Sequence, residues 1–193
     1  EGPDSLYTLL SISSQQPYIF DDMTLRQNLE LFNPDKTLDA RAAQILEAVG
    51  LAKLIPDLDK SGKRRLSGGE RVRFGLARAL LKVTPGQPMI VLLDEPTSAL
   101  DVSLRTQILD LLLDLQERLD LSFIFISHDI GVIRYFCDRV AVMFRGRIVE
   151  SGETEQICTN PQHAYTKALL SAVPRPAPRA RGIHKRHRYQ EAS

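Results

Sequence analysis

Five successive apolar residues, Met89 to Leu93, constrain the fold of this chain more than any other feature. Such a run is typical of a strand that is covered on both faces within a parallel sheet. A second apolar run, Phe123 to Ile126, predicts another covered strand. The first strand ends at Asp94 and Glu95, and the second ends at Ser127-His128-Asp129. Because ligands of open α/β sheets bind at the carboxyl edge, these polar residues are the first candidates for a site.

Helices are predicted between and after these strands, which favours an α/β fold with a parallel sheet. Apolar residues from Ser103 to Leu119 recur at helical spacing. Ile130 to Phe136 also has a helical pattern. Val140 to Phe144 has the pattern of a strand, and Arg145-Gly146 predicts a tight turn into a further strand.

The amino-terminal half is predicted to begin with a strand and to continue with helices. Leu6 to Ser13 has the apolar, β-rich character of a strand. Thr24 and Ser67 are predicted to cap two helices, and a third helix is expected over about residues 39–50. The helices within about residues 21–82 are expected to form a small helical subdomain.

The turn Ser67-Gly68-Gly69 opens one of these helices and resembles a phosphate-binding site. Free backbone N–H groups and the helix dipole both favour an anion at such a terminus. Two consecutive carboxylates, Asp94 and Glu95, suit a metal ion and an attacking water. Together these features predict that the chain handles a nucleoside triphosphate.

Each of these residues also has a purely structural interpretation. Asp94-Glu95 could serve as a helix cap before a proline turn, and a single histidine such as His128 is more often structural than functional. Asp101 could merely cap the helix that follows it, and Gln15 could be a surface turn residue. Position favours a functional role for His128, because it emerges at the same sheet edge as Glu95.

Composition restricts the class of protein. Of the 193 residues, 43% are hydrophobic and 25% are charged, which is ordinary for a soluble globular protein. No apolar run approaches the roughly 20 residues that a membrane-spanning helix needs. Cys137 and Cys158 have no metal-ligand spacing and are interpreted as reduced thiols of a cytosolic protein.

The net charge of +1 conceals a basic tail. Residues 175–193 hold six Lys and Arg residues against Glu191, a net charge of +5, so residues 1–174 carry −4. The tail has the composition of a disordered segment. Its basic residues could contribute a weak contact with anionic lipid, and no specific recognition of nucleic acid is expected.

The order and spacing of these motifs resemble the ATP-binding cassette of ABC transporters over about residues 6–174. The motifs are Gln15, Leu66 to Glu70, Val91 to Asp101, and Ser127-His128-Asp129. The resemblance implies a P-loop NTPase-like fold and the cofactors ATP and Mg²⁺. It also implies a dimer with a second cassette subunit, transmembrane permease partners, and a peripheral location on the cytoplasmic face of the membrane.

The resemblance further implies a role for each matched residue. Gln15 corresponds to the Q-loop glutamine, which senses the γ-phosphate and the metal, and Asp94 to the aspartate that organises magnesium. Glu95 corresponds to the catalytic base and His128 to the switch histidine. Asp101 corresponds to the D-loop aspartate at the dimer seam. Ser67, Gly68 and Gly69 belong to the signature motif, which would contact ATP held by the opposite subunit.

The second half of the chain permits a narrower comparison. The segment Asn160 to Leu170 is similar to one in ATPase subunits that import oligopeptides, dipeptides or nickel. The segment Gln15 to Phe20 is more similar to exporter cassettes. Import of peptides or a related solute is the favoured interpretation. A soluble ABC ATPase that acts outside transport is an alternative.

One motif of the family has no match in the sequence. A nucleotide-hydrolysing cassette is expected to contain Gly-x-x-x-x-Gly-Lys-[Ser/Thr], and the one Gly-Lys pair, Gly62-Lys63, lacks the other residues of that pattern. We expect an amino-terminally truncated cassette or, alternatively, a degenerate subunit that supplies the signature motif in trans. In either case the isolated chain is predicted to bind ATP poorly, to hydrolyse none, and to expose a sheet edge or apolar face that associates.

Overall fold

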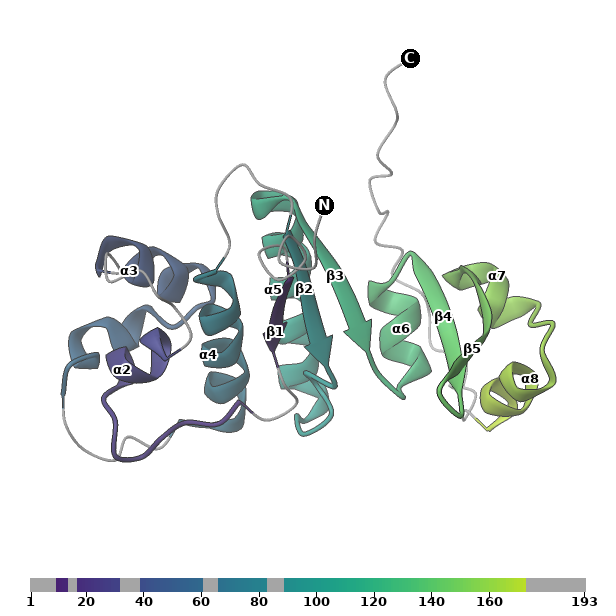
Figure 1. The fold of residues 1–193 in the computed structure, drawn as a ribbon, viewed down its shortest axis with the longest axis horizontal. Helices are drawn as coiled ribbons and strands as arrows, with labels where there is room; N and C mark the ends of the chain where they lie inside the picture. The colour runs from purple at the N-terminus through teal and green to yellow at the C-terminus, as the bar shows by residue number, and fades with distance from the viewer. Residues whose placement is uncertain (1–9, 14–16, 32–38, 61–65, 83–88, 173–193) are drawn as a thin grey trace, which may run out of the picture.

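A short parallel sheet lies in the middle of the elongated molecule (Figure 1). The computed structural model describes residues 10–13, 17–31, 39–60, 66–82 and 89–172. The sheet consists of β1 (Leu10–Ser13), β2 (Met89–Asp94) and β3 (Leu121–Ile126), in that order. All pairs are parallel, and Leu92 lies in register with Ile12 on one side and Ile124 on the other. The predicted α/β class with a parallel sheet is confirmed.

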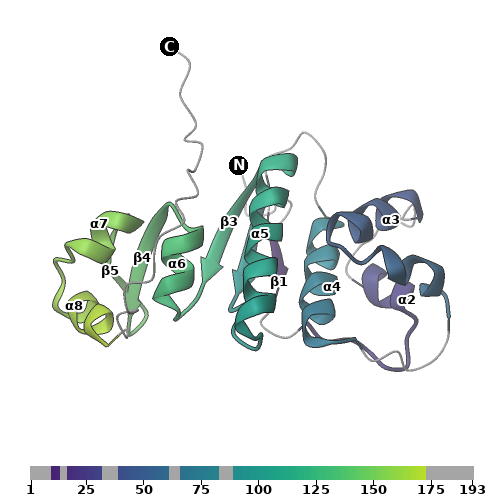
Figure 2. The same cartoon turned by 180° about the vertical axis from the view of Figure 1, so that it is seen from behind.

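Two helices cover one face of this sheet. The helix α4 (Gly68–Leu80) packs against β1, and α5 (Val102–Leu119) packs against β3 and is seen in front of the sheet in Figure 2. The β2 side chains on this face, Val91 and Leu93, are fully buried. Alternate side chains of a strand point to opposite faces of the sheet, so the remaining strand residues lie on the other face.

The other face is open to solvent among the described residues. Ile12, Ile124, Ile126 and Ile90 expose 60%, 49%, 47% and 36% of their surface. The prediction of strands covered on both faces is therefore wrong. An uninterrupted apolar run predicts that both faces are apolar, but only packing decides whether something covers them, and the described helices lie on one side.

A hairpin forms a second, separate sheet. β4 (Arg139–Phe144) and β5 (Arg147–Glu153) pair antiparallel around a turn in which Arg145 and Gly146 both adopt positive φ. The hairpin was expected, but it does not extend the parallel sheet. The helix α6 (Ile130–Phe136) leads into it, and a cleft of about 910 Å³ separates β3 from β4 and β5.

The amino-terminal helices pack onto the side of α4 that faces away from the sheet (Figure 1). They are α2 (Leu25–Glu30), α3 (Asp39–Ala48) and the 3₁₀ helix η1 (Ala52–Asp57). Thr24 caps α2 as predicted, and its hydroxyl accepts the N–H of Gln27 at 3.1 Å. Leu46, Leu54 and Phe74 are fully buried, and the apolar cluster runs without a break from these helices to α6.

Two short helices complete the carboxyl-terminal part. They are α7 (Thr154–Thr159), which the sequence pattern did not predict, and α8 (Ala164–Ser171). The carboxylate of Glu150 in β5 accepts the backbone N–H groups of Gln162 at 2.6 Å and His163 at 3.1 Å. These bonds, the first above all, lower the pKa of Glu150 and fix the start of α8. None of the described helices is both long and apolar enough to cross a membrane.

Candidate functional site

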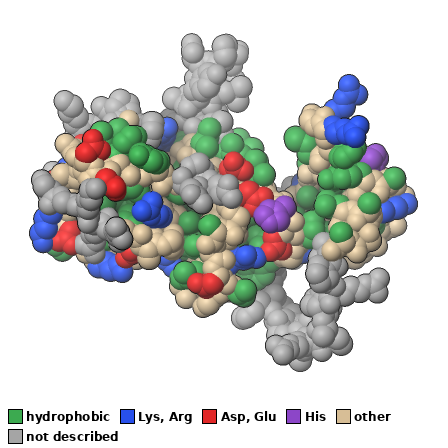
Figure 3. All heavy atoms as spheres, turned by 90° about the horizontal axis from the view of Figure 1, so that it is seen from below, with side chains coloured by type: hydrophobic (Ala, Val, Ile, Leu, Met, Phe, Trp, Pro, Cys, Tyr) green, Lys and Arg blue, Asp and Glu red, His purple; other side chains and the backbone are tan. Residues whose placement is uncertain are grey.

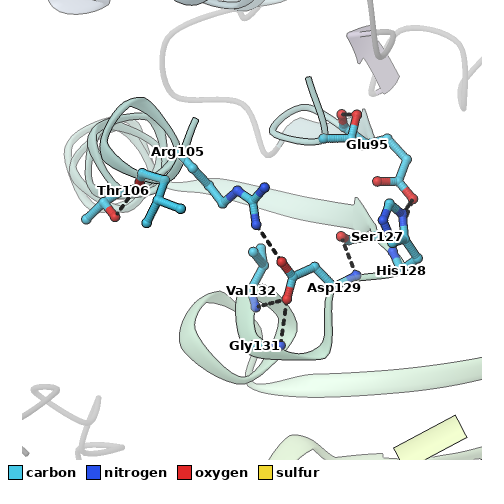
Figure 4. A network of polar contacts seen from close by, with 10 residues as sticks. Glu95, Arg105, Thr106, Ser127, His128, Asp129, Gly131 and Val132 are labelled. Carbon is cyan, nitrogen blue, oxygen red and sulfur yellow. Dashed lines mark hydrogen bonds and ion pairs between the residues drawn. The ribbon is translucent and has the colours of Figure 1, made fainter. Parts of the chain in front are cut away.

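The strand ends bring Glu95 and His128 into contact. The carboxylate Oε1 of Glu95 accepts the backbone N–H of His128 at 3.1 Å and lies 2.7 Å from the imidazole Nδ1 (Figure 4). The Glu95 side chain is 20% exposed and the His128 side chain is 78% exposed. The expected juxtaposition at the carboxyl edge of β2 and β3 is therefore present, and it is open to solvent.

The backbone of Glu95 is strained. Its φ of +48° lies in the left-handed region, which costs a residue with a side chain about 1–2 kcal/mol. Three hydrogen bonds hold it there: its N–H donates to the Ile126 carbonyl at 3.0 Å, and its own carbonyl accepts the N–H and the hydroxyl of Ser98 at 3.2 and 3.0 Å. Strain maintained by the surroundings is common where a side chain must be aimed. Here it directs the carboxylate of Glu95 toward the turn after β3.

Asp94 is the residue at this edge that could hold a metal. It is exposed and directly precedes Glu95. Within the described part of the chain, no group of three or more His, Cys, Asp or Glu side chains forms a ready metal cage. Mg²⁺ is commonly bound by one or two carboxylates together with phosphate oxygens and water, so a single carboxylate fits that ion when a nucleotide is present. In the space-filling view of Figure 3, a histidine lies among acidic side chains near the middle of the face.

The predicted signature turn is built as a capping box. The hydroxyl of Ser67 accepts the N–H of Glu70 at 3.3 Å, and the Glu70 carboxylate accepts the N–H of Ser67 at 2.7 Å. An ion pair with Lys53 at 2.7 Å, followed by the Ser67 N–H, holds the pKa of Glu70 below its usual value. Ser67 and Gly68 are exposed, whereas Gly69 is buried. The start of α4 is thus a rigid terminus with part of its backbone accessible.

The turn at Asp101 lies next to this signature turn. A Cβ added to Gly68 would lie 3.6 Å from the Leu100 side chain, and one added to Gly69 would lie 3.5 Å from the Leu104 side chain. The carboxylate of Asp101 accepts the Leu104 N–H at 2.9 Å and caps α5. The structural interpretation of Asp101 as a cap is therefore confirmed, and the residue is exposed to solvent.

Some sequence predictions lie beyond the described residues. They concern Gln15, the Gly62-Lys63 pair and the basic tail from residue 175. Neither Cys137 nor Cys158 forms a disulfide within the part of the chain that the structure describes, and burial raises the pKa of Cys158.

Sequence reasoning missed the part played by Arg105 and Asp129. Nη1 of Arg105 donates to Oδ2 of Asp129 at 2.5 Å, across 24 positions of sequence (Figure 4). The position of Asp129 directly after His128 was visible in the sequence. Its partner on α5 was not, because one arginine on an amphipathic helix has the appearance of a solvated charge.

Comparison with known proteins agrees with the fold. Residues 4–98 match the family described as ABC transporter, and residues 149–192 match the oligopeptide/dipeptide transporter, C-terminal region. The chain thus carries part of an ABC transporter ATPase domain, followed by an oligopeptide/dipeptide transporter C-terminal region.

Three proteins similar to this chain have names that describe peptide transport. The chain is 49% identical over 141 residues to a peptide import ATP-binding protein of Brucella ovis, covering 73% of this chain and 42% of the relative. It is 55% identical over 115 residues to the dipeptide transport ATP-binding protein DppF of Haemophilus influenzae, covering 60% of this chain and 34% of that protein. It is 47% identical over 147 residues to the oligopeptide transport ATP-binding protein OppD of Mycobacterium bovis, covering 74% and 22%. The chain thus spans less than half the length of these relatives, whose names describe peptide import, dipeptide transport and oligopeptide transport.

Proposed function

We propose that this chain is part of an ATPase subunit that drives peptide import. It supplies the signature turn and the carboxyl edge of the sheet, where ATP would be hydrolysed. The observation that carries the proposal is the contact between Glu95 and His128 at the ends of adjacent parallel strands. The match of residues 149–192 to the oligopeptide/dipeptide transporter region supports the class of solute.

The geometry supports a division of labour at this edge. Glu95 is the proposed general base: its carboxylate is aimed by a strained backbone and is still accessible to a water molecule. His128 is the proposed switch residue, since its imidazole projects into solvent beyond Glu95 and could reach a terminal phosphate. Asp94 is the proposed Mg²⁺ ligand, and a bound Mg²⁺ would offset the charge on the phosphate oxygens. Gln15 is proposed as a further sensor of phosphate and metal.

The signature turn is proposed to act on a second cassette subunit. Ser67, Gly68 and Gly69 would contact ATP held by that partner, with Asp101 at the seam. The closeness of Gly68 to the Leu100 side chain supports this, because it places the two turns side by side. Permease subunits in the membrane and a peripheral location on its cytoplasmic face complete the proposal. Residues 21–82 are the proposed helical subdomain, and residues 175–193 are the proposed basic tail.

A chimera tests the proposal directly. The residues of DppF from Haemophilus influenzae that match this chain are replaced by the matched 115 residues of this chain. ATP hydrolysis and binding are then compared with those of Glu95→Gln in the same chimera. Removal of a positioned general base is expected to slow hydrolysis by roughly 10²–10⁴ while ATP binding is retained.

A matched control uses the exposed Glu117 on α5, and Glu117→Gln is expected to leave turnover within twofold. Turnover of the Glu95→Gln chimera equal to that of its parent would remove Glu95 from the role of base. Uptake of a labelled dipeptide by cells that depend on the chimera tests the solute class separately. The isolated chain, by contrast, is expected to show no micromolar affinity for ATP in calorimetry.

A further inference from the structure

The imidazole of His128 is held at very few points. Its side chain is largely exposed, and the contacts that orient it go to one carboxylate oxygen of Glu95. Packing therefore contributes little to its orientation. The position of the imidazole depends on where the turn of residues 127–129 is placed.

Asp129 fixes that turn with both of its carboxylate oxygens. Oδ1 accepts the N–H groups of Gly131 at 2.9 Å and Val132 at 3.3 Å, which caps α6. Oδ2 accepts the guanidinium of Arg105 at 2.5 Å. The Asp129 N–H also donates to the Ser127 hydroxyl at 3.1 Å, which closes the turn around His128. One oxygen thus serves the local fold, and the other ties the turn to a distant helix.

Arg105 lies one helical turn from Asp101 on the same helix. The Arg105 N–H donates to the Asp101 carbonyl at 2.9 Å, and the Asp101 side chain caps α5. A shift of the Asp101 turn would therefore move the base of the Arg105 side chain directly. The ion pair transmits that shift to Asp129 and so to the residue beside it, His128.

The local fold leaves part of Arg105 unsatisfied. Its Nε is buried and finds no hydrogen-bond acceptor among the described residues. An unsatisfied buried donor is unfavourable, and each case in a native structure requires an explanation. The ion pair that Nη1 makes with Asp129 leaves Nε without an acceptor but offsets that cost, since a charge-assisted bond is among the stronger polar contacts.

We propose that Arg105 is a positioning residue that sets the orientation of His128 through Asp129, and that it couples the Asp101 turn to the histidine. The effect of this coupling on ATP hydrolysis rests on the proposed function. The positioning itself does not, because it concerns a contact within this chain.

The tautomer of His128 reports this positioning. In the structure Nδ1 lies 2.7 Å from a carboxylate oxygen of Glu95, and because an ionised carboxylate only accepts, the proposal places the proton of the neutral imidazole on Nδ1. Long-range ¹H–¹⁵N spectra of the whole chain in alkaline buffer distinguish Nδ1–H from Nε2–H, and His128→Gln assigns the signal. We expect Arg105→Ala and Asp129→Asn to lower the ratio of Nδ1–H to Nε2–H at least fivefold. Arg105→Lys should restore part of that ratio.

Two features of the design separate positioning from loss of structure. Asparagine retains the oxygen that caps α6, so Asp129→Asn removes the ion pair and keeps the cap. Tyr135→Phe removes another link between α5 and α6, in which the Tyr135 hydroxyl donates to Asp110 at 2.6 Å, and it should leave the tautomer ratio unchanged. A ratio in Arg105→Ala equal to that of the parent chain overturns the proposal, as does an equal loss in Tyr135→Phe.

Kinetics of the chimera give a second measurement. Arg105→Ala and Asp129→Asn are expected to lower kcat about tenfold with the KM for ATP within twofold, while Tyr135→Phe keeps both. Unchanged kcat in an active chimera contradicts the coupling. An inactive chimera contradicts the proposed function instead, and the tautomer ratio then decides the positioning alone.

Discussion

The open face of the parallel sheet is expected to make the chain self-associate, and two conservative substitutions on it should prevent this. Ile12 and Ile124 expose 60% and 49% of their surface on that face. Together they present about the surface of one whole isoleucine, whose burial contributes about 1.5–3 kcal/mol. In a two-fold symmetric dimer both copies contribute, so Ile12→Thr with Ile124→Thr should weaken dimerisation by about 3–6 kcal/mol, or roughly 10²–10⁴ in Kd.

Sedimentation velocity over a concentration series measures this Kd directly. Threonine keeps the β-branched shape that a strand favours, so the sheet itself should persist. Val102→Thr is the control, because Val102 is exposed on α5 and lies away from this face. A parent chain that stays monomeric over the whole series, or a double variant with the parent's Kd, would refute the reasoning.

Further predictions concern the helical side of the molecule. The pKa of Glu70 is lowered in the fold, so its stabilising contribution is complete above its unfolded pKa of about 4.5 and is lost as the pH falls through the folded value. The free energy of unfolding of Glu70→Gln, measured in urea, should therefore depend less on pH below 4.5 than that of the parent chain. Glu117→Gln is the control. Gly50→Ala should lower the free energy of unfolding by about 1–2 kcal/mol from its φ of +72° alone. It should cost more than Gly146→Ala, because a Cβ at Gly50 would lie 2.8 Å from Nη1 of Arg73 and displace the hydrogen bond of that atom to the Val49 carbonyl, whereas one at Gly146 meets nothing within 4 Å; equal losses in thermal unfolding would contradict this.

Local patterns predicted most individual elements correctly. Thr24 and Ser67 form capping boxes at the predicted helix starts, and Gly50 adopts the positive φ expected after a helix. These features depend on residues within one turn of each other, so short-range chemistry specifies them.

The errors share one cause. Ile90 and Ile124 were predicted to be covered because their strands are apolar throughout, yet their burial depends on what packs above them. The strand Val140 to Phe144 and its hairpin turn were predicted correctly, but the separation of this hairpin from the parallel sheet was not predicted, because pairing between distant strands is a long-range choice.

The sequence by itself indicated that Glu95 and His128 would lie at one edge of the sheet. Each comes at the carboxyl end of an apolar run that is predicted to be a strand of the same parallel sheet. The sequence also determined the chemical character of the signature turn, which needs only a serine, two glycines and a helix start. The tertiary structure alone decided that Glu95 would take a left-handed backbone, and that Arg105 would reach Asp129 from another helix. Such contacts depend on the distance and angle between packed elements, which short-range sequence patterns do not specify.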